Sequence, residues 1–146
     1  MMKTLFWHDE DTCGALEKID LGKDIRADIF LHGVCGIFAL ALHNEFGYDI
    51  LVAAEENTEG LPWDERLVHA YCCKDDAYID VRGITEDEDS FLDEFSDFLD
   101  RHSEYFEISP AELKKSIVDL MTSSEYEWFY RTAVDLIQSN KEEYSI

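Results

Sequence analysis

The stretch Gly33-Val34-Cys35-Gly36-Ile37-Phe38-Ala39-Leu40-Ala41-Leu42 decides how this chain is expected to fold. Its nearly unbroken apolar character predicts a buried helix over residues 34–46. A glycine flanks this helix at either end, and Gly47 stands where a left-handed C-terminal cap is usual. The helix is therefore expected to carry Cys35 in its first turn, against the interior of the protein.

A β-hairpin is predicted further along the chain, with strands at residues 67–73 and 77–82. A turn at residues 74 and 75 would place His69 directly opposite Asp80, whereas a turn one position later would make them diagonal neighbours. In both registers the two side chains share one face of the hairpin, because side chains alternate along a strand. The sequence leaves the register open but predicts that His69 and Asp80 lie close together.

Other segments give weaker patterns. A strand is expected at residues 48–54, because β-branched residues dominate its centre. Residues 12–21 indicate a short helix, and residues 25–31 indicate an apolar-leaning connector. After Gly83 the pattern becomes helical, and Thr85 is the expected cap of a helix whose apolar stripe comprises Phe91, Leu92, Phe95, Phe98 and Leu99.

Two further helices complete the C-terminal half. Ser109, followed by a proline and then by a glutamate three residues after the serine, is typical of a helix start. The last helix is expected to begin at Thr122 or Ser124, each followed by a glutamate three positions on. These elements predict an α+β fold in which a cysteine-bearing helix packs on a small antiparallel sheet and acidic amphipathic helices follow. No linker or repeat divides the chain, so residues 1–146 are expected to form a single domain.

The charge of the chain limits its partners. There are 34 Asp and Glu against 12 Lys and Arg, a formal net charge of −22. Such a charge repels phosphate, which disfavours direct binding to nucleic acid or to an anionic membrane surface and favours a basic protein partner. No apolar run is long enough for a signal peptide or a membrane span. The cysteines are too sparse for a secreted disulfide scaffold and form no Cys-x-x-Cys pair, so a cytoplasmic protein with reduced thiols and no cofactor is expected.

Cys35, His69 and Asp80 form a candidate catalytic set. The unpaired N–H groups and the dipole at a helix N-terminus favour the thiolate of a cysteine in the first turn. His69 is expected to accept the thiol proton and return it to a leaving group, while Asp80 fixes the imidazole tautomer. The backbone N–H of Cys35 is a candidate oxyanion donor. Together these residues predict a thiol hydrolase.

The same residues resemble those of the papain-like and transglutaminase-like cysteine hydrolases, in which a helix-borne cysteine is followed by His and Asp on adjacent strands. More narrowly, residues 31–98 are similar to small uncharacterised bacterial and phage proteins with the motif Gly-x-Cys-x-x-Phe-Ala-x-Ala-Leu-His, matched here by Gly33, Cys35, Phe38, Ala39, Ala41, Leu42 and His43. The resemblance implies a papain-like core, with Cys35 as nucleophile, His69 as base and Asp80 as orienting acid. It also implies a protein or peptide substrate, since the superfamily includes peptidases, glutamine deamidases and acyl transferases. The chain departs from the pattern in having no Trp after the cysteine and no upstream Gln or Asn as an oxyanion donor.

Each of these residues also has a structural interpretation. A lone cysteine on an apolar helix is usually a small core residue, and a His beside an Asp is often a stabilising contact. Zinc binding is a further alternative, because His32 with Cys35, and His69 with Cys72, offer two nitrogens and two sulfurs. Residues three apart on a strand point to opposite faces, however, so one ion would not reach both His69 and Cys72. No metal site is therefore predicted.

A run of acidic residues supports a different class of function. Eight carboxylates and no Lys or Arg lie between residues 86 and 100. In a helix, five of them would form a row about 21 Å long, comparable to several backbone phosphates: Glu86, Asp89, Asp93, Asp97 and Asp100. The alternative function is thus an acidic nucleic-acid mimic that occupies the basic groove of a DNA- or RNA-binding protein, as anti-restriction and anti-CRISPR proteins of mobile elements do. Such a protein could use a hydrolase fold that has lost its chemistry, or the row could be a solvated helix face that keeps the chain soluble.

Overall fold

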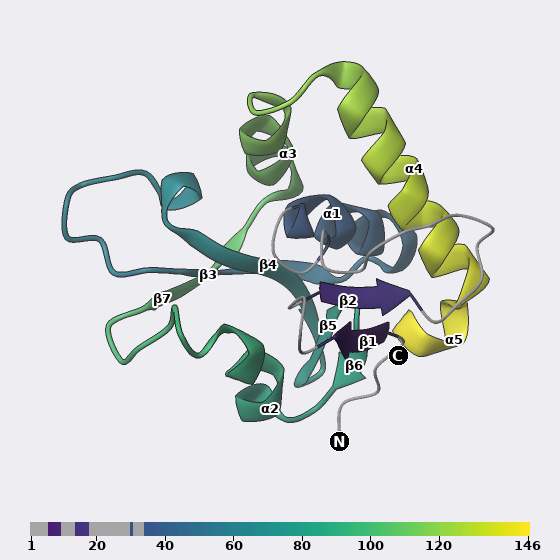
Figure 1. The fold of residues 1–146 in the computed structure, drawn as a ribbon, viewed down its shortest axis with the longest axis horizontal. Helices are drawn as coiled ribbons and strands as arrows, with labels where there is room; N and C mark the ends of the chain where they lie inside the picture. The colour runs from purple at the N-terminus through teal and green to yellow at the C-terminus, as the bar shows by residue number, and fades with distance from the viewer. Residues whose placement is uncertain (1–5, 10–13, 18–29, 31–33) are drawn as a thin grey trace.

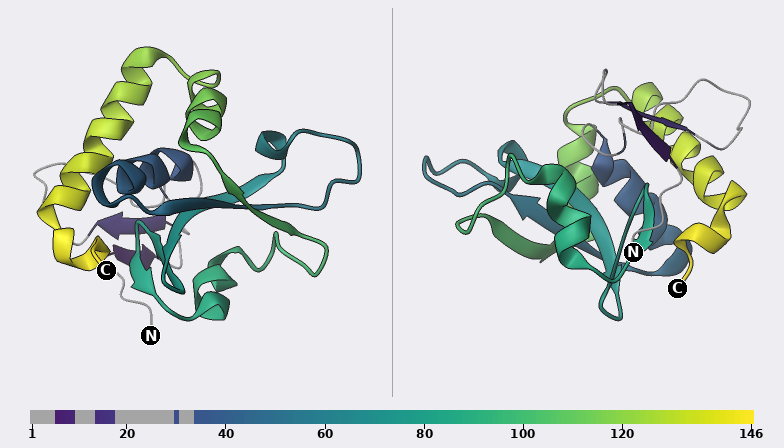
Figure 2. Two further views of the ribbon diagram at one scale, coloured as in Figure 1. Left: turned by 180° about the vertical axis from the view of Figure 1, so that it is seen from behind. Right: turned by 60° about the horizontal axis from the view of Figure 1, so that its bottom comes forward.

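The computed structural model describes residues 6–9, 14–17, 30 and 34–146 and has an α+β architecture (Figure 1). A five-stranded antiparallel sheet in the order β6-β5-β4-β3-β7 carries helix α1 on one face. Helices α3 and α4 pack against α1, and α2 covers the opposite face of the sheet (Figure 2). The predicted class, a cysteine-bearing helix on an antiparallel sheet, is confirmed at this level.

The strands are β1 (Phe6–Asp9), β2 (Gly14–Glu17), β3 (Asp49–Ala54), β4 (Leu67–Lys74), β5 (Ala77–Asp80), β6 (Gly83–Thr85) and β7 (Glu104–Ile108). The α-helices are α1 (Cys35–Phe46), α2 (Glu88–Leu92), α3 (Pro110–Val118), α4 (Ser123–Ser139) and α5 (Lys141–Tyr144). Two short 3-10 helices are η2 (Trp63–Glu65) and η3 (Asp93–Phe95).

Helix α1 is the centre of the core, as its sequence predicts. Residues 35–42 are all buried, because the sheet lies on one side of the helix and α3 and α4 lie on the other. A helix covered on both sides needs apolar residues all round rather than a single stripe. Gly36 faces α3 so closely that a Cβ atom there would lie 2.8 Å from Cδ1 of Ile117. At the other end Gly47 adopts φ 76° and donates its N–H to His43 O, which is the expected left-handed cap.

The hairpin of β4 and β5 adopts one of the two expected registers. Cys72 pairs with Ile79 and Cys73 pairs with Tyr78. The turn therefore consists of Asp75 and Asp76, which both have positive φ values, 50° and 66°. Two consecutive left-handed residues are the signature of the tight hairpin turn that matches the twist of the strands. In this register His69 and Asp80 are diagonal neighbours.

The sequence did not reveal the two outer strands of the sheet. Gly83, expected to end the hairpin, instead begins β6, which pairs with β5. On the opposite edge β7 pairs with β3, with Phe106 opposite Val52. Both strands are short, three residues in β6 and five in β7, so neither is long enough to show the alternation by which strands are recognised.

The single helix expected from Thr85 to Leu99 is wrong. Helix α2 is capped by Asp87, whose side chain accepts from the N–H groups of Asp89 and Ser90, and it ends at Leu92. The 3-10 helix η3 and a turn follow it. Like charges four residues apart destabilise a helix, and this acidic segment contains such pairs without a single cation. Thr85 instead accepts a hydrogen bond from the N–H of Asp87.

The other helix starts are confirmed. Ser109 caps α3, with Pro110 as its first residue, and Thr122 forms a capping box with Glu125 at the start of α4. Near the N-terminus, residues 14–17 form β2 and not part of the short helix expected over residues 12–21. The rest of that segment, and all but Phe30 of the connector at residues 25–31, lie outside the described residues.

We expect Gly47→Ala to lower the free energy of unfolding by about 1 kcal/mol, because an alanine in the left-handed region is strained. A Cβ at this position would meet no atom within 4 Å, so the loss comes from the backbone conformation alone. Gly47→Asn is the matched control and should lose less, since asparagine tolerates this conformation. Urea unfolding measures both. Equal losses for Ala and Asn would contradict the assignment of Gly47 as the cap.

Candidate active site

Three elements bring the predicted catalytic residues together. Cys35 is the first residue of α1, His69 lies on β4 and Asp80 is the last residue of β5. Strand β4 pairs with β5 only from Cys72 onward, where Cys72 lies opposite Ile79. Nearer the start of β4, the N–H of Ala70 instead donates to Sγ of Cys35 over 3.3 Å. The N-terminus of α1 is thus fixed beside the strand that carries His69.

His69 is fully buried and held on two sides. Its Nε2 lies 2.9 Å from Oδ2 of Asp80. The ring stacks on Phe95 with centroids 4.3 Å apart and an interplanar angle of 25°, and Phe91 lies at 6.0 Å. Asp80 occupies Nε2, so Nδ1 is the ring nitrogen left for the thiol. Nδ1 is buried and makes no hydrogen bond of good geometry within the described part of the chain, but the thiol of Cys35 lies close enough to raise the pKa of His69.

The thiol and the imidazole stabilise each other's charged forms. Burial acts to raise the pKa of Cys35, but the His69 imidazole and the backbone N–H groups of Ala70 and Gly36 outweigh it and leave this pKa lowered. Burial acts to lower the pKa of His69, but Asp80 and the thiol of Cys35 outweigh it and leave this pKa raised. Both shifts favour a thiolate beside an imidazolium, which is the reactive form of a cysteine nucleophile.

Asp80 is held in turn by Arg82. The guanidinium Nη2 lies 2.7 Å from Oδ2, Nε lies 3.1–3.2 Å from both carboxylate oxygens, and the backbone N–H of Arg82 donates to Oδ1 over 2.8 Å. Burial acts to raise the pKa of Asp80, but the charge of Arg82 and the hydrogen bond from His69 hold it well below its usual range. Sequence reasoning assigned no role to Arg82, although it stands two residues after Asp80 and so shares its face in an extended chain.

The site is closed over most of its surface. Cys35 is 5 % exposed, and His69 and Asp80 are buried. Cys35 therefore presents little surface at which another molecule could approach it. Low exposure also lowers the effective dielectric constant around the pair, and this strengthens the electrostatic interactions within it.

The residues considered for zinc do not form a ligand set. Sγ of Cys72 donates to Ala39 O on α1, whereas the ring of His69 stacks on Phe95 and bonds Asp80. His32 lies outside the described residues. Among those that are described, no group of three or more His, Cys, Asp and Glu side chains could hold a metal ion.

The five acidic residues of the proposed row do not share one helix. All five are exposed, but Asp89 lies in α2, Asp93 lies in η3, and the others lie in turns and loops: Glu86, Asp97 and Asp100. The straight row that the helix would have produced is therefore not formed. Partner binding by these exposed carboxylates stays a prediction.

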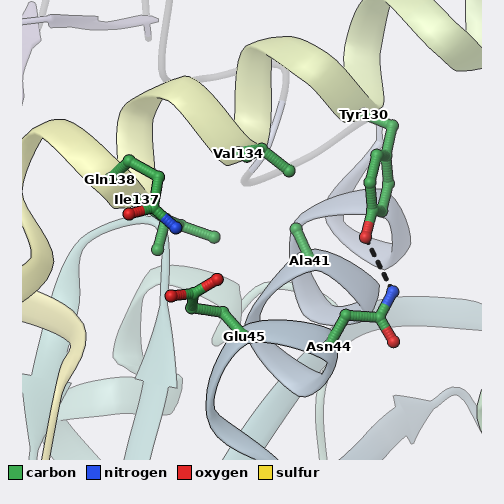
Figure 3. Close-up of a pocket in the computed structure, with 7 residues that line it drawn as sticks. All are labelled: Ala41, Asn44, Glu45, Tyr130, Val134, Ile137 and Gln138. Atoms are coloured by element: carbon green, nitrogen blue, oxygen red, sulfur yellow. Dashed lines mark hydrogen bonds between the residues drawn. The ribbon is translucent and has the colours of Figure 1, made fainter.

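A separate cavity lies on the other side of α1. It has a volume of about 220 Å³ and is lined by residues of α1 and α4, which Figure 3 shows facing one another: Ala41, Asn44, Glu45, Tyr130, Val134, Ile137 and Gln138. Nδ2 of Asn44 donates to the hydroxyl of Tyr130 over 2.7 Å across it. None of the three predicted catalytic residues lines this cavity.

No family model matches the chain, and neither curated proteins nor solved structures provide a match. In the part of the chain that the structure describes, no helix combines the length and apolar character needed to span a bilayer. The chemistry of the site therefore rests on its own geometry.

We expect Asp80→Asn to lower the free energy of unfolding by about 3–5 kcal/mol, because it leaves the buried guanidinium of Arg82 without a counter-charge. Glu104→Gln is the matched control: it breaks the 3.0 Å ion pair with Arg66, but the Glu104 side chain is 43 % exposed. This control should lose no more than about 1 kcal/mol. Urea unfolding compares the two, and similar losses would show that the Asp80–Arg82 pair is not the buried interaction described.

Proposed function

We propose that this protein is a small cytoplasmic cysteine hydrolase or amidase with a papain-like core, acting on a protein or peptide substrate. The observation that carries the proposal is the convergence of Cys35, His69 and Asp80, in which the pKa of the thiol is lowered although Cys35 is buried. A cysteine that is only a core residue has its pKa raised by burial, as for Cys72 in the same sheet. The cysteines at 35, 72 and 73 are all free, which suits a reducing compartment.

The reaction follows from the positions of the three groups. The thiolate of Cys35 attacks the carbonyl carbon of an amide or ester and forms a C–S bond, while the carbonyl electrons move onto oxygen. The backbone N–H of Cys35 is a candidate donor to that oxyanion. Collapse of the tetrahedral species breaks the bond to the leaving group, which takes a proton from the imidazolium of His69 and leaves an acyl-thioester. His69 then removes a proton from water, the hydroxide attacks the thioester, and the thiolate is released.

Asp80 supports both half-reactions without changing its own charge. It accepts from Nε2–H of His69 and so keeps Nδ1 as the nitrogen that exchanges protons with the thiol. Its pKa lies well below neutrality, so it remains a carboxylate whenever His69 changes protonation state. This arrangement makes His69 a general acid in the acylation step, as the imidazolium, and a general base in the deacylation step, as the neutral imidazole.

The test is the pH dependence of alkylation by iodoacetamide, followed at each cysteine by peptide mass spectrometry. Cys35 should react with a midpoint below about 8.5, the pKa of an ordinary cysteine, and faster at neutral pH than Cys72 or Cys73, because both of these have raised pKa values. His69→Ala should remove this preference. His43→Ala is the matched control, since His43 lies on the same helix as Cys35 but bonds Tyr48 O instead.

A second measurement follows the chemistry directly. With p-nitrophenyl acetate, the protein should release a burst of nitrophenolate and gain one acetyl group on Cys35, and Cys35→Ser should lose the burst. Slow alkylation of Cys35 together with no acetylation would reject the hydrolase. It would leave His69 and Asp80 as a structural contact.

Binding to a basic protein is a second candidate function. Its support is that none of the five exposed carboxylates named above forms an ion pair with a residue in the described part of the chain. Binding to a basic nucleic-acid-binding protein should then weaken steeply with salt and fail in the Asp93→Asn, Asp97→Asn, Asp100→Asn triple variant. It should be unaffected by Cys35→Ala. Binding that is insensitive to both salt and the triple variant would reject this candidate.

A further inference from the structure

We propose that Arg82 is a positioning residue of the active site, which acts through Asp80 to hold the His69 imidazole against the Cys35 thiolate. The inference rests on the hydrolase function proposed above and extends its machinery from three residues to four. Arg82 touches neither the thiol nor the place where a substrate would react. Arg82 therefore acts on the thiol indirectly, through the carboxylate of Asp80 and the imidazole of His69.

The contacts of Arg82 fix Asp80 in one orientation. The guanidinium reaches both carboxylate oxygens, and the backbone N–H of the same residue bonds Oδ1. Oδ2 is shared between Arg82 and Nε2 of His69, at 2.7 and 2.9 Å. A carboxylate with donors on both oxygens cannot rotate without breaking bonds, so the direction in which it accepts from His69 is set by Arg82.

Arg82 is itself held rigidly. Its Nη2 also donates to Phe91 O over 3.0 Å, and its guanidinium carbon lies 4.8 Å from the centre of the Phe91 ring and 5.6 Å from that of Phe95. Phe95 is also the ring on which His69 stacks. The two aromatic residues of α2 and η3 therefore contact both the guanidinium of Arg82 and the imidazole of His69.

The charges around the imidazole balance only when Arg82 is included. With Asp80 ionised, an imidazolium and a thiolate leave one buried negative charge in excess, and Arg82 supplies the matching positive charge. The ring contacts of His69 are with uncharged side chains, Phe91 of α2, Phe95 of η3 and Tyr71 of β4. Burial raises the pKa of Tyr71, and the charge of Glu88 on α2 acts on it in the same direction. Cys72, on the opposite face of β4, has its pKa raised partly by the charge of Asp80. Loss of the Arg82 charge would make the potential at Sγ more negative and disfavour the thiolate.

The experiment measures the pH midpoint of Cys35 alkylation in the full chain for the wild type, Arg82→Met, Arg82→Gln and Arg82→Lys. The two neutral variants should raise the midpoint by about one pH unit, since Arg82 acts on the thiol through intervening groups rather than directly. Arg82→Lys should restore most of the wild-type midpoint because it keeps the charge. If circular dichroism shows that Arg82→Met does not fold, the midpoint is taken from Arg82→Gln, which retains polar contact with Asp80.

Arg66→Met is the matched control. Arg66 is also a mostly buried arginine that pairs with a carboxylate, Glu104, and bonds the backbone oxygens of Glu55 and Leu61, but it contacts none of the residues of the site. Its variant should lose stability without moving the Cys35 midpoint, which separates a positioning role from a general loss of folding.

The outcomes distinguish the two proposals. A lowered midpoint in the wild type that stays unchanged in the folded neutral variants of Arg82 would overturn the role of Arg82 and leave the hydrolase standing. A wild-type midpoint like that of an ordinary cysteine, together with no acetylation of Cys35, would reject the hydrolase itself. A rise in the neutral variants that Arg82→Lys reverses, with no rise in Arg66→Met, supports the positioning role.

Discussion

A carboxylate buried between a guanidinium and an imidazole has to be fully hydrogen-bonded, and this requirement organises the structure around Asp80. An unpaired charge in the core would cost more free energy than a domain of this size can spare. Arg82 and His69 meet the requirement from two directions. Each of them is then held by the aromatic rings of Phe91 and Phe95, so the short α2–η3 segment is fixed to the sheet by the same residues that compensate the charge.

Helix α1 places the thiol at the end of this network. Because the sheet covers one side of the helix and α3 and α4 cover the other, its position is fixed by packing on both sides. Because Gly36 has no side chain, Ile117 of α3 can pack closely against the first turn of α1. The sulfur of Cys35 is thereby set against the N–H of Ala70, one residue after His69. A thiol on a packed helix and an imidazole on a strand keep their relative geometry better than residues on loops would.

The residues that could be predicted from the sequence are those that follow a strong local rule. The apolar run after Gly33, the glycine at 47 and the serine and threonine caps at 109 and 122 all specify local structure, and each was placed correctly. The approach of His69 to Asp80 followed from alternation along strands, although the turn residues did not decide the register until Asp75 and Asp76 were seen with positive φ. Strands β6 and β7 are not predicted because both are short, and their pairing with β5 and β3 depends on tertiary contacts rather than on a local pattern.

The failure of the long acidic helix and the omission of Arg82 have a common cause. Hydrophobic periodicity places Phe91 and Phe95 one helical turn apart, and they do lie together, but their partners are the ring of His69 and the guanidinium of Arg82 rather than the continuous apolar surface that periodicity assumes. Apolar side chains of similar volume would stabilise the fold as well or better, because the attraction within a buried ion pair seldom exceeds the free energy needed to remove the two charges from water. The network ends at the Cys35 thiol, whose pKa is lowered by the His69 imidazole, and apolar side chains in place of this network could not have that effect. The physical cost of Arg82 and Asp80 is therefore easiest to understand if both act on Cys35.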